Sequence, residues 1–414
     1  MWMIPFLICF PLVVAALMFV IRNEKIRGIV AYIGAGTIMA VTGWFAVEWF
    51  LAGTPLMELY YHTHTIDMIM LGGVWLLMFV ITYLSFKYRK HIISLLSIIP
   101  TLMVTYMELF GPEMAEIAHI RVDKLSMLMC IIIGVIGSLI VIYSVGYMHG
   151  YHHHHTEFAD RRYYFFTLLF IFLGAMFGFV LSDGLLWLDL FWEMTSICSF
   201  LLIRYTMSEE AINNAFRALW MNLLGGAALV VAICYVGYTS GNLTLSNLVE
   251  RGVAGDATAV IPVALIAVAA LTKAAQMPFS TWLMGAMVAP TPVSALLHAV
   301  AVVKAGAFCV LRVVCFVFGP ESASWCNGST ILSWFAIATI ILSSLVAMRQ
   351  DNLKARLAFS TVGQLSYIVL GISILSLYSI GGAIFHIVAH ALLKITLFMS
   401  AGAIFVTTGL SEIS

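Results

Sequence analysis

The sequence predicts an all-α polytopic membrane protein, and three observations support this class. Hydrophobic residues make up 62% of the 414 residues and charged residues only 10%, whereas soluble domains carry about 25% charged residues. The apolar residues gather in runs of about 20, which is the length needed to cross a hydrocarbon core about 30 Å thick. These runs must be helical, because an unpaired backbone group in lipid costs several kcal/mol.

Thirteen candidate spans follow one another along the chain, joined by short loops. In order, they cover residues 1–21, 28–51, 68–86, 92–111, 125–147, 163–182, 184–204, 217–239, 259–282, 291–318, 330–348, 354–375 and 378–406. The first run lacks a basic leader and a small-residue cleavage site, so we expect a retained helix. No Pro- or Ser-rich linker divides the chain, which predicts a single membrane domain.

Lys and Arg side chains set the expected orientation in a cell inner membrane. Loops after odd-numbered spans hold eleven of them, against three after even-numbered spans. Because basic residues collect on the cytoplasmic side, the N-terminus is predicted outside and the loop with His152–His155 in the cytoplasm. A run of four histidines can bind a metal, but a solvated loop is the preferred interpretation.

Several ionisable residues remain inside the spans. They are Asp189 and Glu193 in span 184–204, Lys273 in 259–282, His298 and Lys304 in 291–318, Lys354 at the start of 354–375, and His386, His390 and Lys394 in 378–406. Each such group costs about 2.5–3.5 kcal/mol near mid-membrane. Ordinary packing does not account for so many, so the default interpretation is an ion or proton path.

Spacing supports that path. His386, His390 and Lys394 recur every four residues, which places them in one stripe about 12 Å long on a single helix face. Pro278, five residues after Lys273, predicts a kink near that lysine. Span 291–318 carries Gly306 shortly after Lys304, which favours a broken helix of the kind that surrounds ion sites in transporters.

Three residues have a structural alternative. Lys354 lies close enough to a span end to extend its amine to the interface. His386 taken alone is compatible with a hydrogen-bonded packing role, and Asp189 with a local hydrogen bond. Lys273, Lys304 and Lys394 lie too deep for the first of these explanations.

Cofactor and nucleic-acid functions have no support in the sequence. The seven cysteines contain no CxxC pair, so buried thiols are expected instead of a metal site or disulfide. The formal net charge is zero and no glycine-rich nucleotide motif occurs. We therefore expect no cofactor in this chain, no nucleic-acid partner and no redox chemistry, so energy must come from elsewhere.

Four stretches carry a family likeness. LTKAAQMPFSTWLMGAMVAPTPVSALLHAVAVVKAG (271–306) resembles the signature of the antiporter-like proton-pumping subunits of respiratory complex I, of Mrp-type cation/proton antiporters and of energy-converting membrane hydrogenases. FWEMTSICSFLLI, DNLKARLAFSTVGQLSYIVLG and FHIVAHALLKITLF fit the same pattern. The likeness covers residues 121–410. It implies an N-terminal region, 1–120, followed by an ion-translocating core, 121–414, that lacks the final helices. Separately, the two lysine-bearing halves, spans 7–10 and 11–13, are candidates for an inverted repeat that is cut short.

The resemblance also implies roles for the buried residues. Glu193 and Lys273 would form a pair that gates the channel, and His298 and Lys304 would bridge to a second half-channel. The remaining members of the path, which would continue the central axis toward an exit, are Lys354, His386, His390 and Lys394.

Three features depart from the family pattern. Gly226 in NLLGGAAL stands where complex I members often have an aspartate. Spans 68–86 and 92–111 look like a two-helix insertion and receive no role. The helix bearing the terminal exit residue is expected after Ser414, together with at least two more.

The function predicted is a proton- or sodium-translocating subunit of a redox-driven complex, with other membrane subunits of a hydrogenase or complex I-like assembly as partners. The alternative is an Mrp-type Na⁺/H⁺ antiporter subunit, which extra carboxylates such as Asp189 would favour. A solute permease and a structural anchor are weaker alternatives. The first lacks a substrate-selective feature, and the second leaves the buried charges unexplained.

Overall fold

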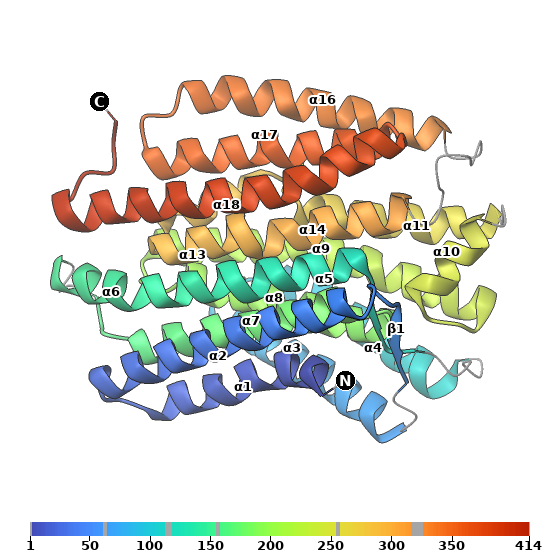
Figure 1. The fold of residues 1–414 in the computed structure, drawn as a ribbon, viewed down its shortest axis with the longest axis horizontal. Helices are drawn as coiled ribbons and strands as arrows, with labels where there is room; N and C mark the ends of the chain where they lie inside the picture. Colours follow the sequence, from blue (N-terminus) through green and yellow to red (C-terminus); the bar gives the residue numbers. More distant parts are fainter. Residues whose placement is uncertain are drawn as a thin grey trace.

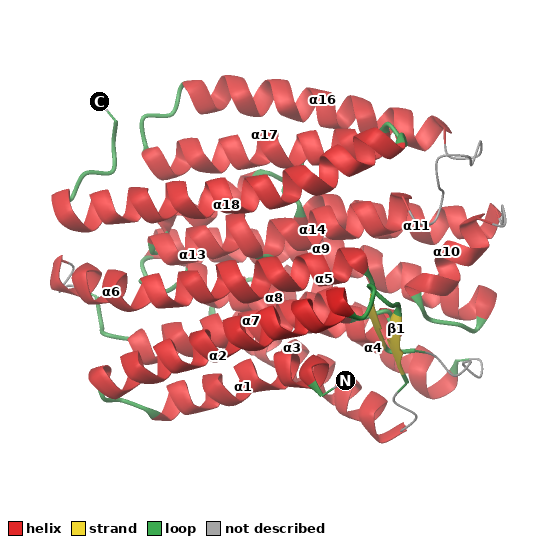
Figure 2. Cartoon of the chain, in the orientation of Figure 1, coloured by secondary structure: helices red, strands yellow, loops and turns green. Residues whose placement is uncertain are grey.

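The computed structural model describes residues 2–60, 64–111, 118–154, 158–253, 257–315 and 326–413. Within them the chain forms a bundle of antiparallel helices with one two-stranded sheet (Figures 1 and 2). Twelve of the described helices are long and apolar enough to cross a membrane, and Val260–Lys273 is a shorter apolar helix. The predicted class, an all-α polytopic membrane protein, is confirmed, and these thirteen helices correspond to the thirteen predicted spans.

The helices follow the chain order shown in Figure 1. Their bounds are α1 Met3–Val20, α2 Glu24–Leu51, α3 His64–Lys87, α4 His91–Phe110, α5 Lys124–Ile131, α6 Ser138–His154, α7 Arg162–Leu181, α8 Leu185–Ile203, α9 Glu209–Ser240, α10 Leu245–Val253, α11 Val260–Lys273, α12 Thr281–Gly285, α13 Thr291–Ala295, α14 Val302–Val310, α16 Cys326–Met348, α17 Leu353–Ser373 and α18 Leu377–Thr408. Strands β1 (Met57–Leu59) and β2 (Ile120–Val122), which were not predicted, pair antiparallel with Met57 opposite Val122.

Capping residues account for several helix ends. The side chains of Asn23, Ser208 and Asn352 accept hydrogen bonds from backbone N–H groups in the first turns of α2, α9 and α17. Gly241 and Gly409 end α9 and α18 in the left-handed conformation, with φ of 64° and 74°. Capping side chains and glycines at the helix ends therefore separate the long apolar helices.

Burial divides the bundle into a centre and a periphery. The segment Thr291–Val313, which contains α13 and α14, is buried along its whole apolar window, whereas only 28% of the window in α3 and 22% of that in α16 are buried. Apolar side chains exposed on α3 and α16 are suited to contact lipid. The ionisable residues of α14 therefore lie in the interior of the protein.

Two helices are interrupted next to lysines. The predicted span 259–282 is wrong at its C-terminal end, because α11 stops at Lys273 and α12 begins only at Thr281. Ala275 has a φ of 52° and Pro278 has no N–H, so an α-helix does not continue through this stretch. The broken helix predicted around Lys304 is confirmed. A π-helical segment, Leu296–Val300, separates α13 from α14, and Ala301 leaves helical geometry at ψ −109°.

The prediction of a loop at His152–His155 is corrected in part. His152–His154 form the last turn of α6, and His155 lies outside the described residues. The His152 ring nitrogen Nε2 is 2.7 Å from the hydroxyl of Tyr205, so this histidine is held against the end of α8. The end of the predicted span 291–318 also lies outside the described residues.

Candidate functional site

Lys273 is the last residue of α11 and is fully buried. Its ammonium donates to the backbone oxygen of Trp192 at 2.9 Å and to Thr195 Oγ1 at 2.7 Å, both on α8. The same ammonium lies 3.8 Å from the centre of the Trp192 ring, within range of a cation–π interaction. The end of α11 is thus joined to α8 through the Lys273 side chain.

Glu193 does not ion-pair with Lys273 within the described part of the chain; the ammonium instead binds the carbonyl of the residue before it. Glu193 lies one turn after Asp189 on α8, and both carboxyl groups have a buried oxygen without a hydrogen-bond partner. A Cβ atom at position 226 would overlap Glu193 Oε1. The absence of a side chain at Gly226 therefore makes the room that the Glu193 carboxylate occupies.

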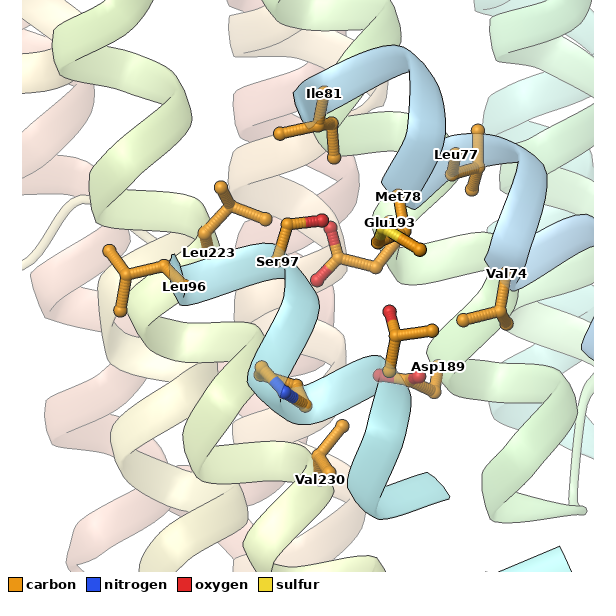
Figure 3. Close-up of a pocket in the computed structure, with 12 residues that line it drawn as sticks. Val74, Leu77, Met78, Ile81, Leu96, Ser97, Asp189, Glu193, Leu223 and Val230 are labelled. Carbon is orange, nitrogen blue, oxygen red and sulfur yellow. The ribbon is translucent and has the colours of Figure 1, made fainter. Parts of the chain in front are cut away.

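A small pocket of about 20 Å³ borders these two carboxylates, between four helices (Figure 3). Its lining residues are Val74, Leu77, Met78 and Ile81 of α3; Leu96, Ser97, Pro100 and Thr101 of α4; Asp189 and Glu193 of α8; and Leu223 and Val230 of α9. The α8 surface that carries the acids thus faces the α3–α4 hairpin, which was predicted as an insertion without a role.

Lys304 continues the buried row toward α18. It is fully buried, and its ammonium donates to the backbone oxygen of Ile387 at 2.8 Å. Gly306, two residues later, lets α14 pack closely against α11, because a Cβ there would lie 2.6 Å from the oxygen of Ala270. His298 lies in the π-helical segment, 4.7 Å from the ring centre of Phe398, and neither of its ring nitrogens has a hydrogen-bond partner.

The last lysines also bind backbone carbonyls of other helices. Lys394 donates to the oxygen of Leu357 on α17 at 2.9 Å. Lys354 donates to the oxygen of Ala289, just before α13, also at 2.9 Å. Lys354 is the second residue of α17 and is partly buried. His386 and His390 lie with ring centres 6.4 Å apart, and both His390 nitrogens lack a partner.

The structure also shows uncharged polar residues at the site, which a search of the sequence for charged residues does not find. Trp192 and Thr195 hold the Lys273 ammonium, and Ser366 of α17 donates to Gln276 Oε1 at 2.8 Å in the break between α11 and α12. Uncharged residues in apolar runs carry little sequence signal. The only available hint was that Gln276 falls between Lys273 and Pro278.

An antiparallel bundle of membrane helices with lysines and histidines along its centre defines the class of antiporter-like membrane subunits. Comparison with protein families agrees. A model described as NADH:quinone oxidoreductase/Mrp antiporter, transmembrane, matches residues 182–413, and one for the N-terminus of chain 5 of NADH-ubiquinone oxidoreductase (complex I) matches 117–159. The chain belongs to the NADH:quinone oxidoreductase/Mrp antiporter family.

Within this family, the chain is similar to A subunits of Na⁺/H⁺ antiporters. The chain is 32% identical to the A subunit of the Na⁺/H⁺ antiporter of Alkalihalophilus pseudofirmus over 396 residues, covering 91% of this chain and 46% of the relative. It is 37% identical to the A1 subunit of the Na⁺/H⁺ antiporter of Staphylococcus haemolyticus over 318 residues, covering 73% and 38%. The chain thus spans less than half the length of these relatives.

Two solved structures share the fold. The Mrp complex from a Dietzia species contains a chain with 30% identity and a TM-score of 0.64, with coverage of 84% of this chain and 38% of that one. A chain of the membrane-bound sulfane sulfur reductase, an archaeal respiratory membrane complex, has 20% identity and a TM-score of 0.77, with coverage of 99% and 72%. At 20% identity the second likeness shows the fold alone.

Proposed function

We propose that the chain moves protons through the membrane along its interior row of lysines and histidines, as one subunit of an Mrp-type Na⁺/H⁺ antiporter. One observation carries this proposal. Four interior lysines each donate to a backbone carbonyl on another helix or at the start of one, and unpartnered histidine nitrogens lie between them. The row therefore links the helices of the interior with groups that can hold or release a proton.

The proposed path begins at Glu193 and Lys273 on the α8 side. It continues through His298 and Lys304 in the broken segment α13–α14. Its last members, on α17 and α18, are Lys354, His386, His390 and Lys394. Neutral imidazoles suit onward transfer through water, because histidine exchanges protons near neutral pH.

Glu193 and Lys273 form the proposed switch. In the present arrangement the Lys273 ammonium is bound to the Trp192 carbonyl and Thr195, and the Glu193 carboxyl lies on the next residue of the same helix. A carboxylate close to an ammonium stabilises its charge, and separation favours loss of the proton. Small movements at the end of α11 would thus bring the Lys273 ammonium closer to the Glu193 carboxylate, which stabilises its charge, or farther from it, which favours loss of its proton.

The relatives support a choice of partners and of energy source for the proposed function. The A subunits of Na⁺/H⁺ antiporters and a chain of an Mrp complex match at 30% identity or more, which favours an Mrp assembly over the hydrogenase type. We place the chain in the cell inner membrane among other membrane subunits, with its N-terminus outside. An Mrp assembly needs no redox partner, since a proton gradient supplies the energy for sodium efflux.

The test is Na⁺/H⁺ exchange by the intact complex in everted membrane vesicles, followed with a fluorescent ΔpH probe. Lys273→Ala should lower the exchange rate by about tenfold or more, a factor that corresponds to about 1.4 kcal/mol on the rate-limiting barrier. Lys25→Ala, which removes an exposed lysine at the start of α2, is the matched control. Unchanged exchange in Lys273→Ala, with the complex intact, would exclude Lys273 from the path.

A further inference from the structure

The pocket between the α3–α4 hairpin and α8 combines several oxygen atoms that lack partners. Asp189 is 2% exposed, and its Oδ1 and Glu193 Oε2 accept no hydrogen bond. From the opposite side come Ser97 and Thr101 of α4, which are 6% and 5% exposed. Figure 3 shows the Ser97 side chain extending toward the Glu193 carboxylate, with Asp189 beside it.

The hydroxyls of Ser97 and Thr101 on α4 differ from most others in this protein. Ser144 and Thr105 donate to the carbonyl four residues earlier, as helical Ser and Thr usually do. Ser97 and Thr101 make no side-chain hydrogen bond with any described residue. Their hydroxyl oxygens are consequently free to face the pocket.

Pro100 adds a further oxygen. It lies inside α4 and also lines the pocket. Because proline has no N–H, the carbonyl of Leu96, four residues earlier, lacks its helical donor. Leu96 lines the same pocket. One turn of α4 thus brings two hydroxyls to the pocket, opposite two carboxyl groups on α8, and the Leu96 carbonyl of the same turn lacks its usual helical donor.

We propose that this pocket is a binding site for one dehydrated monovalent cation, Na⁺, and that the α3–α4 hairpin supplies its neutral ligands. All the available donors are oxygens, which hard cations prefer. A cavity of about 20 Å³ holds a single water-sized body. It cannot hold Mg²⁺ with its retained waters. The Na⁺/H⁺ antiporters whose A subunits match this chain favour Na⁺ as the occupant.

The site is placed to compete with Lys273. The Lys273 ammonium approaches α8 at Trp192, while the pocket meets the Glu193 carboxylate from the α3–α4 side. A cation bound there would neutralise the same carboxylate that otherwise stabilises the ammonium, and so would favour release of the proton from Lys273. This consequence rests on the proposed function, whereas cation binding itself does not.

The hairpin is fixed firmly enough to hold such a site. Trp187 of α8 donates to Asp67 Oδ1 of α3 at 3.2 Å, and Trp75 of α3 donates to Thr105 Oγ1 of α4 at 3.0 Å. At Gly73 a Cβ would lie 3.1 Å from the Leu190 side chain, so α3 and α8 pack closely. The hydroxyls of α4 therefore keep a defined position relative to α8.

Binding is tested on the purified intact complex with dicyclohexylcarbodiimide, which modifies buried carboxyl groups, followed by mass spectrometry of peptides containing Asp189 and Glu193. NaCl should protect these residues and choline chloride should not. In Ser97→Ala/Thr101→Val, half-protection should need about tenfold more Na⁺, equivalent to about 1.4 kcal/mol. Ser94→Ala is the matched control, since Ser94 is buried on the same helix but does not line the pocket.

Equal protection by Na⁺ and choline, or identical Na⁺ dependence in the double variant and Ser94→Ala, would overturn the site and leave a bound water as its occupant. Exchange in vesicles separates the two proposals. Sodium protection that persists while Lys273→Ala still exchanges normally would refute the proton path and retain the site. Loss of exchange in Lys273→Ala without any sodium protection would retain the path and refute the site. Co-purification of the other subunits shows that each variant is assembled.

Discussion

Replacing Gly306 with alanine tests how closely the two broken helices must approach. Gly306 lies in α14, two residues after Lys304, and packs against the C-terminal end of α11, which carries Lys273. An added Cβ would lie 2.6 Å from the oxygen of Ala270 and 2.9 Å from the Cα of Ala274. Both are backbone atoms, so neither can move aside by a change of rotamer.

The destabilisation expected for Gly306→Ala follows from these distances. The backbone nitrogen of Ala274 would be closer still, so an ordinary contact of about 3.4 Å requires α11 and α14 to separate by more than about 0.8 Å at this point. Overpacking of this kind costs about 1–3 kcal/mol. We expect Gly306→Ala to lower the melting temperature of the purified complex by a few degrees. Exchange in vesicles should also fall, because the Lys273 and Lys304 helices no longer meet at their present spacing.

Gly381→Ala is the matched control, because nothing lies within 4 Å of a Cβ at that position in α18. It should be neutral or stabilising by about 0.5–1 kcal/mol, as alanine is in a helix interior. Thermal unfolding followed by light scattering, together with the ΔpH assay, measures both effects. If Gly306→Ala unfolds and exchanges like Gly381→Ala, the close approach of α11 and α14 is not required.

Three further outcomes are expected. Thr195→Val removes one of the two acceptors of the Lys273 ammonium and should lower the exchange rate more than Thr239→Val; equal rates would show that this bond has no role. Ser366→Ala removes the bond to Gln276 and should destabilise the complex by about 1 kcal/mol in thermal unfolding, and no change would mean that the α11–α12 break is held otherwise. The hydrogen bond from Arg162 lowers the pKa of Asp160 to about 2. The Asp160 carboxylate therefore stabilises the fold above its unfolded pKa of about 3.9, and this contribution is lost as the pH falls toward 2. Asp160→Asn should lower the free energy of unfolding at pH 7 by less than about 1 kcal/mol, because the side chain is half exposed. The variant should match wild type near pH 2, and an equal deficit at both pH values would contradict this.

The sequence by itself determined the class of protein and most of its spans. Composition and the length of apolar runs are enough for that, because a bilayer accepts only helices of a certain length. The ionisable residues of the interior were also identifiable, since a charge within an apolar run is costly and conspicuous. The break near Lys304 followed from local residue types alone.

Only the tertiary structure decided what these residues contact. Lys273 binds Trp192, 81 positions away, and Lys304 binds Ile387, 83 positions away; both acceptors are backbone carbonyls, which every residue has. The need for glycine at position 226 likewise depends on another helix, because a Cβ there would overlap Glu193 of α8. The α3–α4 hairpin, an insertion by sequence, gains a role only because packing brings Ser97 opposite Glu193. Local sequence patterns specify where helices form and which residues in them are polar. Helix packing brings together residues that are far apart in the chain, and no local pattern in the sequence indicates which residues will meet.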